Sequence, residues 1–183
     1  VIERIGSEKL ESLNAADIFC ARNGDIWVGG DRGLFRKRKA EDVFERIDLS
    51  SRRLGGVSSI MEDTQGDIWI AACESGLYRY DAGRNKFYTY LDPVLYFSNV
   101  VYQDDKQQIW VGTWDRGLVK LKTPYTTGRM QYDRFHRVEG EENSLFDNIV
   151  YAIEQDESHR IWVGTRSGLS IMPVSYTHLT LPT

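Results

Sequence analysis

The sequence is poor in the residues that build disulfide frameworks and metal sites. Only two of its 183 residues are cysteines and only three are histidines, which excludes a disulfide framework and a cysteine-rich zinc site. Cys20 and Cys73 fall at unlike positions of the pattern described below, so a bridge between them is disfavoured. His136, His159 and His178 have no ligand spacing. We therefore expect no metal and no cofactor.

Long apolar runs and an excess of positive charge are also missing. No apolar stretch approaches the length that crosses a bilayer. The 27 acidic residues outnumber the 23 basic ones, and the formal charge of −4 would repel a phosphate backbone. Gly-x-Ser-x-Gly, His-Glu-x-x-His and phosphate-loop motifs do not occur. Nucleic-acid binding, a membrane span within the chain and the enzyme classes marked by these motifs are therefore disfavoured.

What the sequence does have is an internal repeat. The tetrapeptide Ile-Trp-Val-Gly, or a close variant, occurs four times, and a Gly-Leu pair follows each copy. The repeated tryptophans are Trp27, Trp69, Trp110 and Trp162, and the repeated glycines are Gly33, Gly76, Gly117 and Gly168. A period of roughly forty residues indicates an array of similar supersecondary units.

Each repeat reads as four short β-strands. Apolar segments at 16–20, 57–61, 99–102 and 149–153 precede the tryptophan strands, which are apolar at consecutive positions and so should be buried on both faces. The Gly of each Gly-Leu pair is expected to supply a left-handed backbone conformation in a tight turn. Strongly alternating segments at 86–90 and 132–136 suit outer strands. The pattern predicts an all-β fold of four-stranded antiparallel β-propeller blades, whereas helical and leucine-rich repeats do not fit it.

The number of repeats predicts an incomplete arc of about three to four blades over residues 1–173. Residues 1–5 resemble the outer strand of a preceding blade, and the fourth blade stops after its third strand near Met172. Val1 in place of Met indicates a removed leader or an internal piece of a larger protein. Residues 174–183 break the repeat. The alternating run 176–181 could form an outer strand, and a non-native ending is the alternative. An open arc leaves two blade faces without partners, so we expect the isolated chain to self-associate or to melt at low temperature.

The repeat resembles the two-component regulator propeller repeat. The resemblance rests on residues 60–69, 143–145 and 161–169, and it extends over 15–172. Departures from the pattern are Ala71-Ala72-Cys73 in place of Gly-Thr, and missing turn glycines at Lys106-Gln107 and Ser158-His159. They affect the type of turn more than the resemblance.

The resemblance implies the sensor region of a bacterial hybrid two-component histidine kinase. In that family the propellers are periplasmic, or more generally extracytoplasmic, and are followed by a β-sandwich, a membrane span and a cytoplasmic kinase. Many members occur in gut Bacteroidota and regulate glycan utilisation. Partners implied in this way are the remaining blades, the neighbouring sensor domains and an oligosaccharide ligand, and a dimeric parent is left open.

Residues that recur once per repeat are better explained by structure than by chemistry. The four repeated tryptophans could form a sugar-stacking ladder, but their apolar neighbours favour a core between blades. Asp63, Asp104 and Asp156 could be acids or metal ligands. Their recurrence before each turn favours a capping role, in which the carboxylate accepts backbone N–H groups.

Trp114 is the one tryptophan outside the repeated position. It falls in the turn between the second and third strands, on the face of a propeller where ligands commonly bind. The candidate ligand-binding residues are those of the equivalent turns: Trp114, Asp115, Arg116, Asp31, Arg32, Glu74 and Arg166. A Trp folded back onto the next blade is the competing interpretation.

These observations lead to three hypotheses about function. The first is a non-catalytic sensory propeller segment that responds to a carbohydrate. The second is a structural propeller that contacts other proteins and binds no small ligand. The third, which is weaker, is a fragment of a sialidase-like or lyase-like propeller enzyme, because the Asp-turn-Gly-x-Ile-Trp run faintly resembles a non-catalytic box of sialidases. We expect this chain not to be an enzyme, although its parent could be a histidine kinase.

Overall fold

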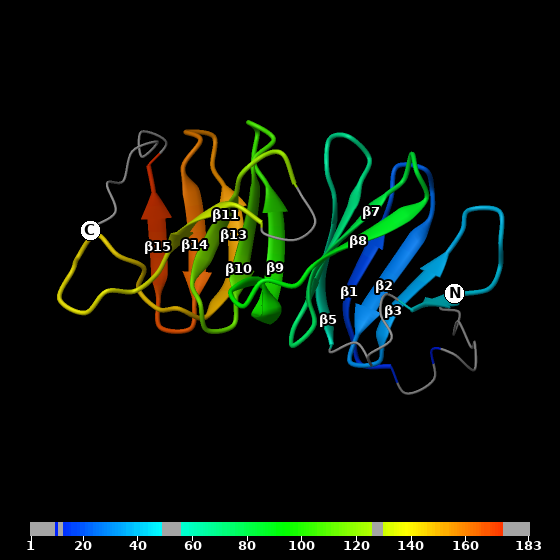
Figure 1. Cartoon of the computed structure of the whole chain (residues 1–183), viewed down its shortest axis with the longest axis horizontal. Coiled ribbons are helices and arrows are strands. Elements are labelled where there is room, and N and C mark those ends of the chain that lie inside the picture. The colour runs from blue at the N-terminus through cyan, green and yellow to red at the C-terminus, as the bar shows by residue number, and fades with distance from the viewer. Residues whose placement is uncertain (1–9, 11–12, 49–55, 126–129, 174–183) are drawn as a thin grey trace, which may run out of the picture.

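The computed structural model describes residues 10, 13–48, 56–125 and 130–173, and these form four antiparallel β-sheets in a row (Figure 1). Blade 1 contains β1 (Ala15–Cys20), β2 (Ile26–Gly30), β3 (Gly33–Lys37) and β4 (Glu45–Ile47). Blade 2 contains β5 (Val57–Glu62), β6 (Ile68–Ala72), β7 (Gly76–Asp81) and β8 (Lys86–Tyr90). Blade 3 contains β9 (Ser98–Gln103), β10 (Ile109–Thr113), β11 (Leu118–Leu121) and β12 (Tyr132–Phe135). Blade 4 contains β13 (Val150–Gln155), β14 (Ile161–Thr165) and β15 (Leu169–Met172).

The strands of every sheet follow one another in chain order, as the repeat predicted. The only helical element in the described residues is a single 3₁₀ turn, η1 (Leu95–Phe97), before β9. The all-β fold with four-stranded blades is therefore confirmed, and blade 4 has three strands among the described residues. The predicted outer strand at residues 1–5 and the segment 174–183 lie outside them.

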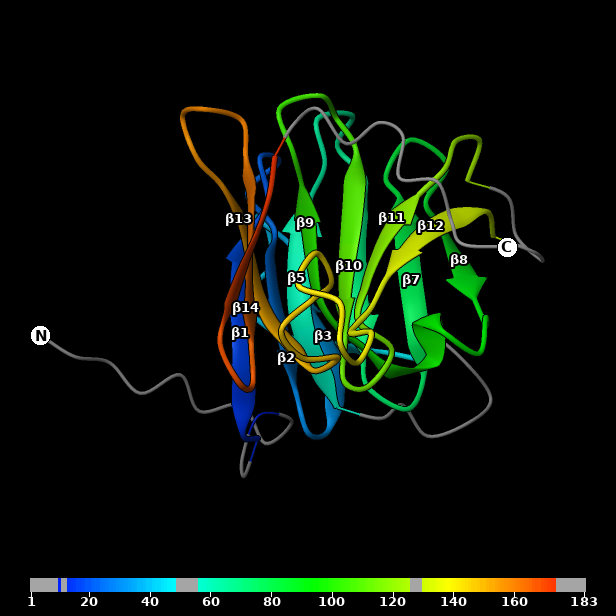
Figure 2. The ribbon, with the colours of Figure 1, turned by 90° about the vertical axis from the view of Figure 1, so that its left-hand side faces the viewer.

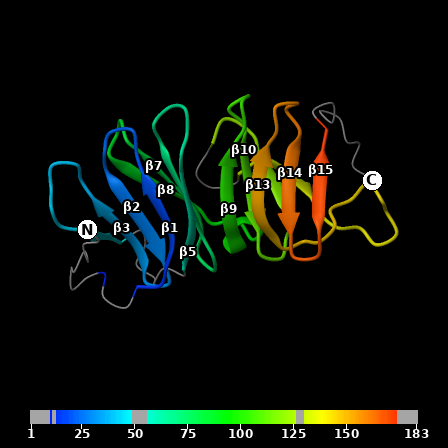
Figure 3. The same cartoon turned by 180° about the vertical axis from the view of Figure 1, so that it is seen from behind.

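The first strands of the four blades form the inner edge of the row. β1, β5, β9 and β13 each contact the corresponding strand of the neighbouring blade, and Figure 3 shows them side by side. Side chains cross between these strands: Asp17 accepts the N–H of Ile60 at 2.6 Å, and the Asn99 amide donates to the carbonyl of Val150 at 2.8 Å. The inner strands therefore join neighbouring blades by hydrogen bonds as well as by packing.

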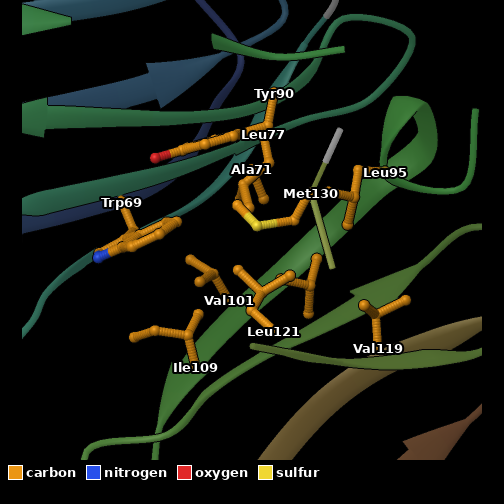
Figure 4. Packing of buried hydrophobic residues seen from close by; sticks show 11 residues of the cluster. Trp69, Ala71, Leu77, Tyr90, Leu95, Val101, Ile109, Val119, Leu121 and Met130 are labelled. Carbon is orange, nitrogen blue, oxygen red and sulfur yellow. The ribbon is translucent and has the colours of Figure 1, made fainter. Parts of the chain in front are cut away.

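The core lies between the sheets rather than within one of them. Trp27 of blade 1 is buried in one cluster with Ile60, Ile70 and Tyr78 of blade 2. Trp69 is buried in the same way against blade 3, in the cluster drawn in Figure 4. Because each blade covers the tryptophan of the blade before it, the array gains a new buried aromatic with every blade added.

Trp162 departs from the prediction that all four tryptophans are buried between sheets. Trp27, Trp69 and Trp110 are 1%, 0% and 5% exposed, whereas Trp162 is only partly buried. The reason is its place in blade 4, because no sheet in the described part of the chain covers that side of β14. Figure 2 looks along the row from this end, with β14 and β15 in front.

Gly168 also departs from expectation. The other three repeated glycines have the predicted left-handed backbone, with φ values of +107° at Gly33, +103° at Gly76 and +85° at Gly117. Gly168 is not among the residues with positive φ. A Cβ there would meet the ring of Phe146 at 2.9 Å, so close approach of an aromatic side chain explains this glycine.

Candidate functional site

The turn between the second and third strands is attached to the equivalent place in each of the four blades. The first residue of each turn donates its backbone N–H to the carbonyl of the residue that leads into the inner strand of the same blade. The four bonds are Asp31 to Asn14 at 3.3 Å, Cys73 to Gly56 at 3.0 Å, Trp114 to Phe97 at 2.9 Å and Arg166 to Ile149 at 3.0 Å. The turns therefore share a face with the connections between blades, which we call the turn face.

Trp114 projects from the turn face of blade 3 and contacts blade 4. Its ring meets the ring of Tyr151, on β13, edge to face at a centroid distance of 5.6 Å and an interplanar angle of 68°. Trp114 is nevertheless 44% exposed and Tyr151 48% exposed. The tryptophan is thus neither fully free nor folded away: it forms an aromatic corner with Tyr151 that remains half open to solvent.

The polar candidate residues differ in how far their own blades already engage them. Both carboxylate oxygens of Asp31 accept hydrogen bonds from Asn14, at 3.1 and 2.7 Å. Arg166 pairs with Asp147 at 3.0 Å. Asp31 and Arg166 therefore serve first to fix their turns, and they are less available to a ligand than the sequence suggested.

The remaining polar candidates lie on blades 2 and 3. Arg116 lies next to Asp115, with 3.4 Å between the guanidinium and the carboxylate, and both side chains are about half exposed. Burial raises the pKa of the Cys73 thiol, and the negative charges of Glu74 and Asp115 add to this shift. The two carboxylates therefore influence the same spot on the turn face, although they come from different blades. The seven-residue site as a whole remains a prediction.

Tyr151 is the residue that the sequence analysis missed. It occupies the second position of β13, where blades 2 and 3 carry Ser58 and Asn99. Blade 1 has Ala16 there, so an aromatic side chain at a position that is otherwise small or polar is the signal that could have identified it.

The repeated aspartates cap their turns, as predicted, and also bind the repeated tryptophans. One oxygen of Asp63 accepts the backbone N–H groups of Gln65 and Asp67 at 2.9 and 3.0 Å. Its other oxygen accepts the indole N–H of Trp69 at 2.8 Å. Asp104 and Asp156 bind Trp110 and Trp162 in the same way, at 2.8 and 2.7 Å. We call this arrangement the Asp–Trp lock.

A metal-binding role for the acidic residues receives no support from their arrangement. Within the described ranges, no group of three or more histidine, cysteine or acidic side chains is placed to hold a metal ion. Cys20 and Cys73 are free thiols. None of the helices searched there is long and apolar enough to cross a membrane.

Comparison with known proteins identifies the same repeat that the sequence analysis suggested. Residues 144–167 match the family model described as two component regulator propeller. The chain is 39% identical over 82 residues to histidine kinase P4 of Formosa agariphila. This alignment covers 40% of this chain and 6% of that protein. The resemblance of the repeats to the two component regulator propeller is confirmed.

Solved structures give the same result. The extracellular domain of the hybrid two component system BT4673 from B. thetaiotaomicron superimposes with a TM-score of 0.72 at 26% identity, over 86% of this chain and 21% of that one. The chain thus spans about a fifth of the length of that structure and a smaller share of the kinase.

A likeness to a propeller enzyme extends to the fold alone. Virginiamycin B lyase from Staphylococcus aureus superimposes with a TM-score of 0.64, over 90% of this chain and 57% of that one. The identity is only 12%, so the comparison shows a shared propeller architecture and no shared chemistry.

Proposed function

We propose that the chain is a sensory propeller segment of a hybrid two-component signalling receptor, and that its turn face binds an extracytoplasmic carbohydrate. The match to the two component regulator propeller model and the likeness to an extracellular receptor domain support the sensory role. The half-open aromatic corner of Trp114 and Tyr151 is the observation that supports the ligand class.

The corner has the chemistry that sugar recognition requires. The apolar face of a pyranose ring packs against an exposed aromatic ring, while its hydroxyl groups need hydrogen-bond donors and acceptors at the rim. Asp115 and Arg116 follow Trp114 directly and are both about half exposed, so they supply a carboxylate and a guanidinium beside the ring. A sugar that carries a carboxylate would gain further from the guanidinium.

Binding of this kind transmits a signal without turnover. A ligand shifts the receptor toward one arrangement only if it binds that arrangement more tightly. Trp114 lies on blade 3 and Tyr151 on blade 4, so a ligand in the corner would favour one relative position of the two blades.

Calorimetry with wild type, Trp114→Ala and Tyr151→Ala tests the proposal. The probes are neutral glucan and xylan oligosaccharides and acidic oligogalacturonates. We expect one class to bind, and each truncation to weaken it about tenfold or more, by analogy with buried aromatic anchors at interfaces. Val43→Ala is the matched control, because Val43 is an apolar residue of blade 1 that is 59% exposed.

The outcomes separate the hypotheses. Unchanged affinity in both aromatic variants, with an intact fold, would place the sugar elsewhere. Failure of every probe to bind wild type would favour the structural alternative, in which the corner contacts another protein.

A further inference from the structure

The end of each inner strand holds the turn of the preceding blade. The side chain of Glu62, at the end of β5, accepts the backbone N–H of Arg22 at 2.7 Å. Gln103 accepts from Thr64 at 2.8 Å, and Gln155 accepts from Asp105 at 2.9 Å. The same bond therefore occurs at all three blade junctions, and we call it the junction tether.

At the two tethers that meet a charged turn residue, the tether side chain matches that residue. Glu62 also forms an ion pair with the Arg22 side chain at 3.0 Å. Gln155 instead donates its amide N–H to the Asp105 carboxylate at 2.9 Å. A carboxylate thus faces a cation, while an amide, which can accept and donate at once, faces an acid.

An aliphatic residue two positions before each tether packs into the tryptophan core. Ile60 shares a buried cluster with Trp27, Val101 with Trp69 and Ile153 with Trp110. Each junction therefore combines an apolar contact with a directional one, and the side chains that make both follow the pattern (Ile/Val)-x-(Glu/Gln).

Blade 4 presents the receiving half of such a junction. Trp162 pairs across strands with Ile171, and Gly164 pairs with Leu169. The side chains of Trp162, Ile171 and Leu169 therefore lie on one face of the sheet. Leu169 is 56% exposed and Ile171 44% exposed. Glu157 occupies the turn position of Arg22, Thr64 and Asp105, and no side chain in the described residues accepts its backbone N–H.

The opposite face, on blade 1, does not match this receiving half. The tether position at the end of β1 is Cys20, whose thiol is a weak acceptor. Val28 and Phe35 of this face are already buried under Phe44, with Leu10 and Leu13 packed alongside. A second copy of the chain would therefore meet neither a tether nor an open apolar surface, although Ile18 is exposed there.

We propose that the face of blade 4 formed by Trp162, Leu169, Ile171 and the Glu157 N–H is a docking surface for one further β-sheet with the pattern (Ile/Val)-x-Gln at the end of its inner strand. Glutamine is selected over glutamate because the Glu157 carboxylate would repel a second acid, as Asp105 would repel one in place of Gln155. The partner is a sheet of this same repeat, and the proposal does not depend on ligand binding at the turn face.

A chain extended by its own junction tests the proposal. Residues 122–172 are repeated after Met172, which gives blade 4 an outer strand and places a second copy of Gln155 opposite Glu157. We expect the Glu157 amide to exchange hydrogen about five- to tenfold more slowly than in wild type, as for one added hydrogen bond. Changing only the second copy of Gln155 to leucine or to glutamate should remove most of that protection while the added sheet remains folded.

Three results would overturn the proposal. The first is equal protection of Glu157 with glutamine and with leucine. The second is a concentration-dependent dimer of wild type that Trp162→Ala abolishes, because the occupant would then be a second copy. The third comes from a variant that serves even if the extended chain does not fold. Gln155→Glu in the original chain should speed hydrogen exchange at the Asp105 amide. Unchanged exchange there would refute the pairing of an amide with an acid.

Discussion

Blades 1 and 2 bury the same tryptophan in different polar surroundings. Trp69 of blade 2 donates its indole N–H to Asp63, which also holds two backbone N–H groups of the turn. Blade 1 has Ala21 at that position, and the indole N–H of Trp27 is buried without an acceptor in the described structure. The comparison separates what the tryptophan contributes by packing from what the aspartate contributes by hydrogen bonding.

Blade 1 has a different charged group, Asp25 with Arg36, beside the tryptophan. Burial alone would raise the pKa of Asp25, but hydrogen bonds from Arg36 and the Lys39 backbone lower it, so the carboxylate stays charged. Arg36 forms an ion pair with Asp25 at 2.6 Å and lies over the Trp27 ring, 4.9 Å from its centroid. Asp25 also accepts the side-chain amide N–H of Asn23 at 3.0 Å, so it holds the β1–β2 turn, but the indole donor is not satisfied. A blade can thus form without the lock when another charged pair fixes the turn.

The largest effect should come from removing the lock of blade 2. Asp63→Ala leaves one indole and two backbone donors without their acceptor, at a site where Asp63 is only 5% exposed. We expect a loss of about 2–5 kcal/mol in the free energy of unfolding, since each unsatisfied buried donor costs about 1–3 kcal/mol. Urea denaturation followed by circular dichroism measures it.

Asp63→Asn is the control for this change, because its amide oxygen keeps one acceptor and the loss should be smaller. Equal stability of wild type and Asp63→Ala would mean that packing of Trp69 alone holds the blade.

A smaller effect of opposite sign is expected from restoring the lock in blade 1. Ala21→Asp places a carboxylate where Asp63 stands in blade 2 and gives the Trp27 indole an acceptor. We expect a gain of about 1 kcal/mol, the net value of a typical hydrogen bond. Ala21→Asn tests whether an uncharged acceptor suffices beside Asp25. A loss of stability in both variants would show that the Arg36–Asp25 pair has taken over the space of the lock.

The smallest effect is expected in blade 4, where the lock lies near solvent. The hydrogen bond from the Trp162 indole, together with the hydrogen bonds and the charge of Arg160, lowers the pKa of Asp156 to about 2. Because the folded state has the lower pKa, the unfolded chain takes up the proton first as the pH falls. The contribution of this lock is therefore complete above the ordinary carboxyl pKa near 3.8 and is lost as the pH falls toward 2.

An NMR acid titration of the Trp162 indole N–H measures this prediction. Its resonance should move with a midpoint near pH 2, and Asp156→Asn should abolish the movement. A midpoint near pH 4 would contradict the lowered pKa of Asp156, and no movement of the indole resonance would contradict the hydrogen bond.

The repeat made the fold predictable, because one buried tryptophan per blade fixes both the period and the packing. The turn-capping role of Asp63 could also be inferred, since it follows from the position of an acid before a tight turn. Its bond to the indole could not, because two residues six positions apart meet only when strand and turn have a defined geometry. Trp162 was placed wrongly because its burial depends on a neighbouring sheet and not on its own strand.

The candidate site was less accessible to sequence reasoning. Trp114 stood out by its position, but its partner Tyr151 comes from another blade, and only a comparison of the inner strands across the repeats singles it out. Asp31 and Arg166 were suitable ligand groups by residue type, yet Asn14 and Asp147 engage them. Charge and residue type identify candidates, whereas availability depends on contacts that only the structure shows.

The short range of the Asp–Trp lock has a consequence for how the chain folds. Lock partners lie six residues apart in blades 2, 3 and 4, so this contact closes a very small loop and needs no other blade. Contacts of low sequence separation form early, because little chain entropy is lost in making them. We therefore expect the hairpins β5–β6, β9–β10 and β13–β14 to act as separate nuclei, each able to start the assembly of its neighbours. The hairpin β1–β2, which lacks the lock, would then join an array that has already begun to form.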